Sequence, residues 1–238
     1  MSKLTTIQTL SQLAFLPRVF PVNCYFVEES DGLTLIDAGM SFSDKKIIQT
    51  AAELGKPITR IVLTHAHLDH VGALDRLSKA IPEASIYISE RDAALLAGDM
   101  SLLPHEPNMP IKGSVPKNVQ TKPNILLQAG DRIGSLLAIS VPGHTPGSMA
   151  FMDSRNGYLI AGDAFQTRGG IAVSGKVQPW FPFPAAATWC KSSALESARK
   201  LCELQPTLLA VGHGPMLGQP LAAMRKAIAE AEVSFNKR

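Results

Sequence analysis

The chain has 238 residues, of which 45% are hydrophobic and 18% are charged, so it can bury a core and is not a disordered chain. Its net charge of +3 is too weak and dispersed to indicate a nucleic-acid or membrane partner, and no apolar run approaches the roughly 18 residues of a membrane span. The cysteines, Cys24, Cys190 and Cys202, are odd in number and widely spaced, which favours reduced thiols. We therefore expect one soluble, cytoplasmic domain over residues 1–238.

In the first half of the chain, two strand signals come before the first helix signal. The turn Ser30-Asp31-Gly32 separates the first two strand-like runs, and Ser43 is the candidate cap of the first helix. Pro82 ends the second helix, because proline cannot continue one. In chain order, we predict strands at Asn23–Glu28 and Thr34–Ile36, a helix from Ser43 to Gly55, a strand at Arg60–Leu63, a helix at Asp69–Ala80, a strand at Ser85–Ile88 and a helix at Glu90–Ala97.

The second half contains two stretches without regular structure signals. Proline and glycine are dense from Gly98 to Pro123, which predicts a long irregular excursion, and Phe165–Pro184 is a second irregular stretch with aromatic residues. The predicted elements are strands at Ile125–Leu127, Leu136–Val141, Met149–Met152 and Tyr158–Ile160, a helix at Thr188–Leu204, a strand at Leu208–Val211 and a helix at Leu221–Val233. Each half has strands first and helices afterwards, which indicates an α/β fold of two packed sheets with helices on their outer faces.

Three of the six histidines lie in one hexapeptide, His65-Ala66-His67-Leu68-Asp69-His70. Residues i and i+2 of an extended segment point the same way, so His65 and His67 can bind one ion together. Asp69 and His70 fall at the start of the predicted helix and approach the same space from another side. Imidazole and carboxylate ligands together suit zinc, iron or manganese.

The remaining candidate ligands each follow a predicted strand and have a glycine next to them, which lets the backbone turn sharply. They are His144 in Pro142–Gly147, Asp163 after Gly162, and His213 between two glycines. The seven side chains predict a dinuclear site in which His65, His67 and His144 hold one ion, Asp69, His70 and His213 hold the other, and Asp163 bridges them. His105 lies in the Pro-rich excursion, and we interpret it as an ordinary surface or core residue.

At these residues the chain resembles the metallo-β-lactamase-fold hydrolase superfamily. The His65–His70 motif, the turn after His144, the Gly162-Asp163 pair and the Gly212–Gly214 segment occur in family order, and Pro21–Tyr25 with Leu35–Gly39 resembles the opening hairpin of the family. The resemblance implies a four-layer αββα sandwich with the metal site at one edge of the two sheets. It implies two divalent metal ions, with zinc favoured and iron or manganese as alternatives, and no organic cofactor.

The resemblance also implies the chemistry, that of an enzyme acting on a small acyl compound. A metal-bridging hydroxide would attack a thioester, ester or lactone carbonyl, and Asp69 would orient the nucleophile as well as bind metal. The branches most similar to this chain are the hydroxyacylglutathione hydrolase-like thioesterases and the lactonases that act in quorum quenching. A mononuclear iron oxidoreductase of the persulfide dioxygenase type is the alternative, and the oligomeric state stays open.

The stretch Phe165–Trp189 follows Asp163 directly, so we expect it to rim the site. Two interpretations stay open for it. One is an apolar wall with a cation for an acyl substrate, formed by Arg168, Lys176, Trp180, Phe181 and Phe183. The other is a loop whose aromatic residues only pack over a sheet edge. We expect Cys24, which lies in a predicted strand, to be a core residue without chemistry.

Overall fold

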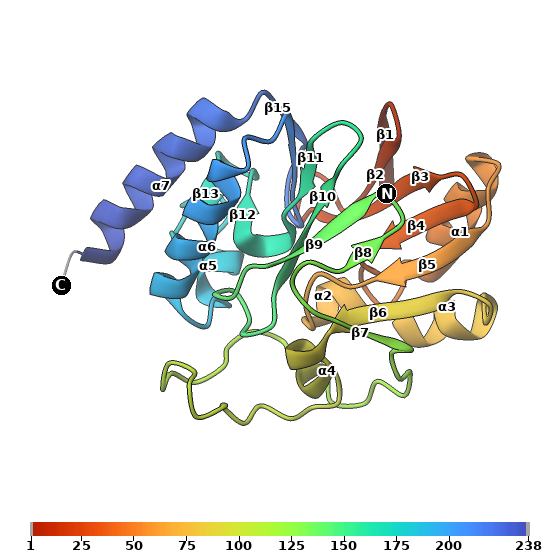
Figure 1. Ribbon diagram of the computed structural model, residues 1–238, viewed down its shortest axis with the longest axis horizontal. Coiled ribbons are helices and arrows are strands. Elements are labelled where there is room, and N and C mark those ends of the chain that lie inside the picture. The colour runs from red at the N-terminus through yellow and green to blue at the C-terminus, as the bar shows by residue number, and fades with distance from the viewer. Residues whose placement is uncertain (1, 237–238) are drawn as a thin grey trace. The chain divides into compact units, whose positions relative to one another are not determined.

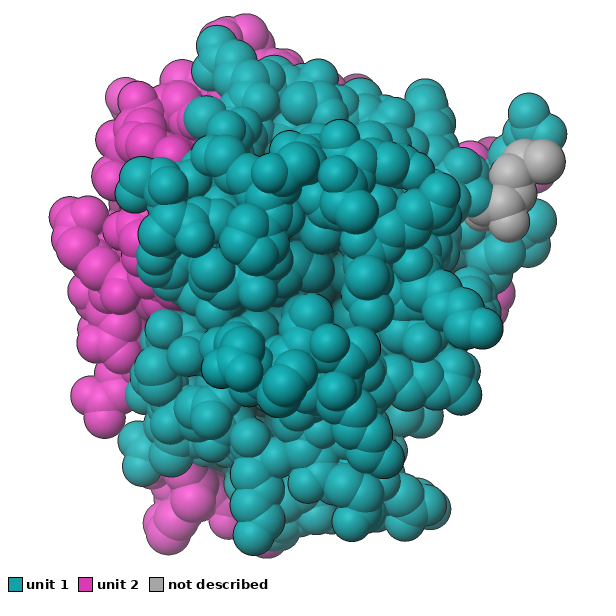
Figure 2. Space-filling model, turned by 90° about the vertical axis from the view of Figure 1, so that its right-hand side faces the viewer, with its two compact units in different colours: residues 1–99, 114–127 teal, residues 100–113, 128–238 magenta. Residues whose placement is uncertain are grey.

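A computed structural model of the protein describes residues 2–236, and these divide into two compact units (Figures 1 and 2). Unit 1 comprises the residues up to Asp99 together with Ser114–Leu127. Unit 2 comprises Met100–Gly113 and the residues from Gln128 onward. A single domain over residues 1–238 stays a prediction.

Unit 1 is built on a seven-stranded sheet whose strands lie side by side in chain order (Figure 1). The first three strand pairs are antiparallel and the last three are parallel. The strands are β1 (Ser2–Ile7), β2 (Leu10–Phe15), β3 (Val22–Glu29), β4 (Gly32–Ile36), β5 (Ile58–Val62), β6 (Ser85–Ser89) and β7 (Ile125–Leu127). The helices are α1 (Asp44–Glu53), α2 (Leu68–Val71), α3 (Leu74–Ala80) and α4 (Glu90–Leu96).

The structure confirms the predicted strands and helices of unit 1 with one correction and one addition. The helix predicted over Asp69–Ala80 is interrupted after α2, because the backbone N–H of Gly72 donates to Gly39 O at 2.8 Å instead of continuing the helix. A Cβ at Gly72 would lie 2.6 Å from Ser41 N, so only glycine allows this close approach. The addition is the β1–β2 hairpin, whose Thr, Gln and Ser residues conceal the strand pattern in the sequence.

Unit 2 is built on a six-stranded sheet with the order β15-β14-β11-β10-β9-β8. Helices α6 (Lys191–Glu203) and α7 (Leu221–Asn236) pack side by side on one face of it, and their buried residues form one apolar cluster with the sheet (Figure 1). The strands are β8 (Arg132–Ile133), β9 (Leu136–Ser140), β10 (Met149–Asp153), β11 (Tyr158–Ile160), β14 (Leu208–Ala210) and β15 (Leu217–Gly218). All strands and helices predicted for this unit are present.

The two stretches predicted to be irregular differ in outcome. Residues 98–124 form neither helix nor strand, as their proline content predicts. The stretch Phe165–Pro184 does contain short elements, because β12 (Phe165–Gln166) and β13 (Ala172–Val173) pair as a ribbon and α5 (Phe183–Ala186) follows them. Strands of only two residues are too short to leave a periodic signal in the sequence.

The described structure also bears on the cysteines and on membrane spans. Cys24, Cys190 and Cys202 are all free and buried. Among residues 2–236, no helix combines the length and the apolar character that crossing a membrane requires.

Candidate metal centre

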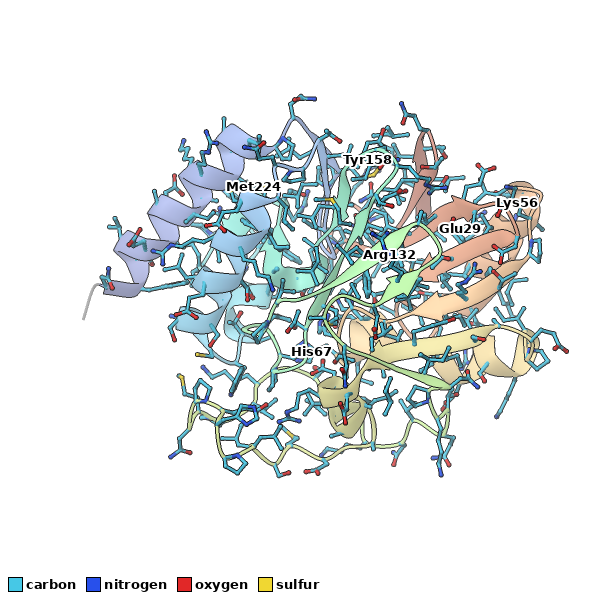
Figure 3. The ribbon with its side chains drawn as sticks, viewed as in Figure 1. Glu29, Lys56, His67, Arg132, Tyr158 and Met224 are labelled. Atoms are coloured by element: carbon cyan, nitrogen blue, oxygen red, sulfur yellow. The ribbon has the colours of Figure 1, made fainter. Side chains whose placement is uncertain are left out.

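The hexapeptide motif of unit 1 begins three residues after the end of β5 and runs into α2, and Figure 3 marks His67, the residue before α2. His65, His67 and His70 are all at least 98% buried, and Asp69 is partly exposed. The ring centroid of His65 lies 4.8 Å from that of His67 and 4.1 Å from that of His70. The structure thus brings the three imidazoles of this motif together, as the spacing predicts.

A buried carboxylate, Asp37, orients two of these histidines. Asp37 follows β4, and its Oδ2 lies 2.7 Å from Nδ1 of His70 and accepts a 2.8 Å hydrogen bond from the Thr64 hydroxyl. Oδ1 of Asp37 accepts a further bond from Thr64 N at 2.8 Å. Because the Thr64 hydroxyl donates to Asp37, it can only accept from Nδ1 of His65, which lies 3.0 Å away. Hydrogens on both Nδ1 atoms leave the Nε2 lone pairs of His65 and His70 for a metal ion.

A second buried carboxylate holds the backbone of the same motif. Asp92, in the first turn of α4, accepts a 2.9 Å hydrogen bond at Oδ2 from the backbone N–H of Ala66. Ala66 lies between the candidate ligands His65 and His67, so this bond fixes the extended segment that presents both rings. Asp37 and Asp92 lie 28 positions before and 27 positions after His65, respectively, and no local pattern links either residue to the motif.

Cys24 lies beside this network but carries no chemistry. Burial raises the pKa of the Cys24 thiol well above its usual value, and the negative charge of Asp37 raises it further. Cys24 is therefore a neutral thiol in the core of unit 1, as the sequence predicts.

Unit 2 brings together the other three candidate ligands. His144, Asp163 and His213 are all at least 95% buried. Oδ2 of Asp163 lies 3.2 Å from Nε2 of His144 and 3.1 Å from Nε2 of His213. Atoms that each bind one ion at about 2.0–2.2 Å lie at such a separation from one another. The carboxylate lies between two imidazoles, which is the placement that a bridging ligand requires.

A directed chain of hydrogen bonds sets the tautomer of His144. Thr188 donates to the carbonyl oxygen of Pro184 at 2.7 Å, and a carbonyl can only accept. The Thr188 hydroxyl therefore accepts from Ser174 at 2.8 Å, and Ser174 in turn accepts from Nδ1 of His144 at 3.0 Å. With its hydrogen on Nδ1, His144 turns Nε2 towards the carboxylate of Asp163. An imidazole nitrogen and a carboxylate oxygen that converge in this way suit a divalent metal ion, so the residues present fit one.

The turn before His144 depends on glycine. Gly143 has φ +145°, and a Cβ there would overlap the backbone of Ala194 in α6. We expect Gly143→Ala to lower the free energy of unfolding by about 3 kcal/mol, because overpacking adds to backbone strain. Gly55→Ala is the control, because Gly55 also has a positive φ but no atom lies within 4 Å of its Cβ position. Chemical denaturation measures both variants, and equal losses would contradict the role of Ala194.

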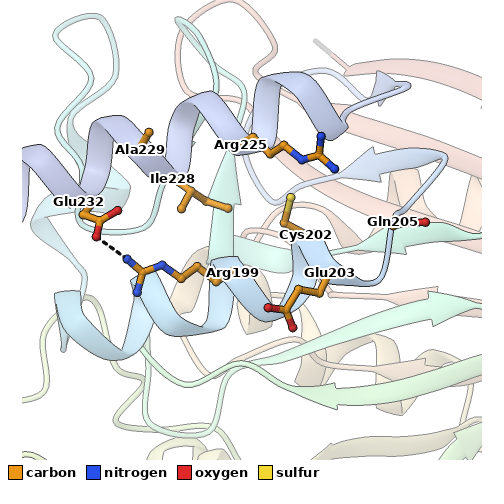
Figure 4. A pocket seen from close by; sticks show the side chains of 8 residues that line it. All are labelled: Arg199, Cys202, Glu203, Gln205, Arg225, Ile228, Ala229 and Glu232. Atoms are coloured by element: carbon orange, nitrogen blue, oxygen red, sulfur yellow. Dashed lines mark ion pairs between the residues drawn. The ribbon is translucent and has the colours of Figure 1, made fainter.

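Two other features lie outside these groups. His105 is exposed in the irregular excursion, in agreement with its interpretation as an ordinary residue. A groove of about 480 Å³ lies between α6 and α7 (Figure 4). Positively and negatively charged side chains both line the groove, and two of them, Arg199 and Glu232, form an ion pair of 2.8 Å. None of the seven candidate ligands lines it.

Comparison with known proteins identifies the family. A model of the metallo-beta-lactamase superfamily matches residues 17–213 of the chain. Uncharacterized protein YobT of Bacillus subtilis (strain 168) is 58% identical over 230 residues, which cover 97% of this chain and 99% of YobT. Probable metallo-hydrolase YflN of the same organism is 30% identical over 220 residues, which cover 83% and 82% of the two chains.

Solved structures show the same fold. TTHA1623, crystallised in a di-iron-bound form, is 26% identical with a TM-score of 0.63, and the match covers 85% of this chain and 92% of that one. The metallo-beta-lactamase from Pontibacter korlensis is 17% identical with a TM-score of 0.73 over 98% and 99% of the two chains, which shows the fold alone.

These matches and the histidine and aspartate groups define the class, which is that of the metal-dependent hydrolases. The chain belongs to the metallo-beta-lactamase superfamily.

Proposed function

We propose that the protein is a dinuclear metal-dependent hydrolase of small acyl compounds. In this proposal, one ion is held by His65, His67 and His144, and Asp163 bridges it to a second ion. The second ion is held by Asp69, His70 and His213. Zinc is the metal that we favour, with iron or manganese as alternatives.

The observation that carries the proposal is the set of hydrogen-bond partners around Nδ1 of three histidines. The hydrogen bonds of His65, His70 and His144 all place a hydrogen on Nδ1, through Thr64, Asp37 and Ser174, respectively. Three buried rings that are fixed in the same tautomer present three Nε2 lone pairs, which a metal ion binds and an apolar core does not use. A structural role would not require this shared orientation.

Further observations support a pair of ions rather than one. Asp163 lies within 3.2 Å of two different imidazoles, as a carboxylate shared between two cations would. The family match spans residues 17–213, so it includes all seven candidate ligands. TTHA1623, at 26% identity, was solved with two irons. Seven ligands also exceed the four positions of a structural zinc site and leave room for water.

The residues have distinct roles in this proposal. A pair of bound divalent ions supplies Lewis acidity, which lowers the pKa of water towards neutrality and polarises a carbonyl oxygen. Asp69 is the only partly exposed ligand of its motif, so its carboxylate is placed to orient the attacking water as well as to bind metal. Asp37 holds Thr64 and His70 and thereby keeps the rings aligned. The substrate is a thioester, an ester or a lactone.

The experiment combines metal analysis with a substrate panel. We expect purified protein to contain two zinc, iron or manganese ions per chain and to hydrolyse at least one of a thioester, an ester and a lactone. Removing the ions with a chelator should abolish turnover, and adding zinc or manganese should restore it. One iron per chain with oxygen consumption and no hydrolysis would instead support the oxidoreductase alternative.

We also propose that the protein acts in the cytoplasm. The three free thiols support this, because a reducing compartment keeps such cysteines unpaired.

A further inference from the structure

Unit 2 exposes a group of large apolar side chains on the segment that follows Asp163. Trp180 is 85% exposed, and Val177 and Phe183 are each 54% exposed. Exposed leucines or valines are common on any protein surface, but three such residues within seven positions, including a tryptophan, are not. We call Val177, Trp180 and Phe183 the aromatic segment surface.

This surface is connected to the candidate ligand His213. The ring of Phe183 lies 5.3 Å from that of Phe181, and the buried Phe181 ring lies 5.4 Å from that of His213. The backbone is connected as well, because Thr167 N and Arg168 N both donate to the carbonyl oxygen of His213. Phe183 is thus linked to the candidate ligand His213 through one buried ring, so a molecule that contacts Phe183 lies two aromatic rings from His213.

A second apolar segment of unit 2 is joined to His144. The indole N–H of Trp189 donates to Met109 O at 2.8 Å, and the backbone N–H of Trp189 donates to His144 O at 3.0 Å. Met109, in the irregular excursion, is 39% exposed, and Met100 and Leu103 of the same excursion are 45% and 42% exposed. Flexible methionines suit apolar ligands of variable shape.

The charge of the aromatic segment is one-sided. Residues 165–190 contain Arg168 and Lys176 and no Asp or Glu. Lys176 shares a groove with Glu230 of α7, so both signs of charge are present there. The exposed apolar side chains of the segment favour an apolar ligand.

We infer that the aromatic segment surface binds the apolar acyl chain of the substrate, so the enzyme prefers medium-chain acyl compounds to short ones. This inference rests on the proposed function and deepens it. Trp180 provides the most exposed contact. Phe183 provides the contact nearer to His213, because the buried Phe181 ring lies next to both Phe183 and His213.

The test compares two substrates that differ only in acyl length, p-nitrophenyl butanoate and p-nitrophenyl decanoate. We expect Trp180→Ala to lower kcat/KM for the decanoate about tenfold, mainly through KM, because contact with roughly two methylene groups is lost. The value for the butanoate should stay within about twofold, and Phe183→Ala should act in the same direction. Leu204→Ala is the control, because Leu204 is 41% exposed at the C-terminal end of α6 and lies outside the segment.

The outcomes separate this inference from the proposed function. If Trp180→Ala lowers the rates for both esters equally, or for neither, the acyl-chain assignment is wrong while the hydrolase stands. If the wild-type protein hydrolyses neither ester, the binding of free decanoate, measured by calorimetry, decides the inference. Tight binding that Trp180→Ala weakens supports the inference. Equal affinity of the wild type and Trp180→Ala for decanoate overturns it. Sedimentation with anionic phospholipid vesicles that depends on Trp180, without any preference for acyl length, would assign the surface to membrane binding instead.

Discussion

Asp163→Ala is expected to lower the metal content of the purified protein and to reduce hydrolysis at least about a hundredfold. The physical reason is that the Asp163 carboxylate lies 3.2 Å from His144 and 3.1 Å from His213, so its loss removes the negative charge beside two candidate nitrogen ligands. Without this carboxylate, less negative charge would offset the repulsion between two nearby cations. Elemental analysis and steady-state rates measure the two effects.

His105→Ala is the matched control for this prediction, because it removes a histidine that is exposed and lies outside both ligand groups. It should leave two metal ions per chain and an unchanged rate. If Asp163→Ala also retains both ions and full turnover, Asp163 is not a bridging ligand, and the dinuclear proposal loses its main support.

Asp37→Ala is expected to destabilise the protein by about 3–5 kcal/mol, a large part of the roughly 5–15 kcal/mol that stabilises a typical domain. Three buried donors, the N–H and hydroxyl of Thr64 and Nδ1 of His70, would lose their acceptor at once. Each such group costs about 1–3 kcal/mol when it is left without a partner in the interior. Denaturant unfolding, monitored by circular dichroism in the presence of a chelator, measures the change without a contribution from bound metal.

Asp31→Ala is the control, because Asp31 is an exposed carboxylate that pairs with Arg60 at the surface of the same unit. Exposed ion pairs contribute little to stability, so its unfolding midpoint should stay near that of the wild type. Equal unfolding midpoints for Asp37→Ala and the wild type would show that Asp37 does not stabilise the segment from Thr64 to His70. Metal titration of the folded Asp37→Ala protein should also show weaker affinity, since His70 is no longer oriented.

Most regular elements were predictable, because their signals are local. The apolar run of β3, the amphipathic face of α1 with Ile47 and Ala51 buried, and the long helix α6 all follow from periodicity within ten to twenty residues. The hexapeptide at His65 was predictable for the same reason, since its ligand spacing is set by the geometry of one extended segment.

The errors arose where a tertiary contact overrides the local signal. The break between α2 and α3 depends on a hydrogen bond from Gly72 to Gly39, which is 33 positions away. The ribbon of β12 and β13 has only two residues in each strand and is stabilised by the packing around it. Neither feature leaves a periodic trace in the sequence.

The sequence by itself indicated the family, most elements of the two sheets and seven candidate metal ligands, because residue type and short-range spacing carry that information. Only the tertiary structure decided which groups orient the histidines. Asp37 lies 33 positions from His70, Asp92 lies 26 from Ala66 and Ser174 lies 30 from His144, so only folding brings them within hydrogen-bond distance. The direction of each hydrogen bond, and with it the nitrogen left for a metal, follows from these distant partners rather than from the motif itself.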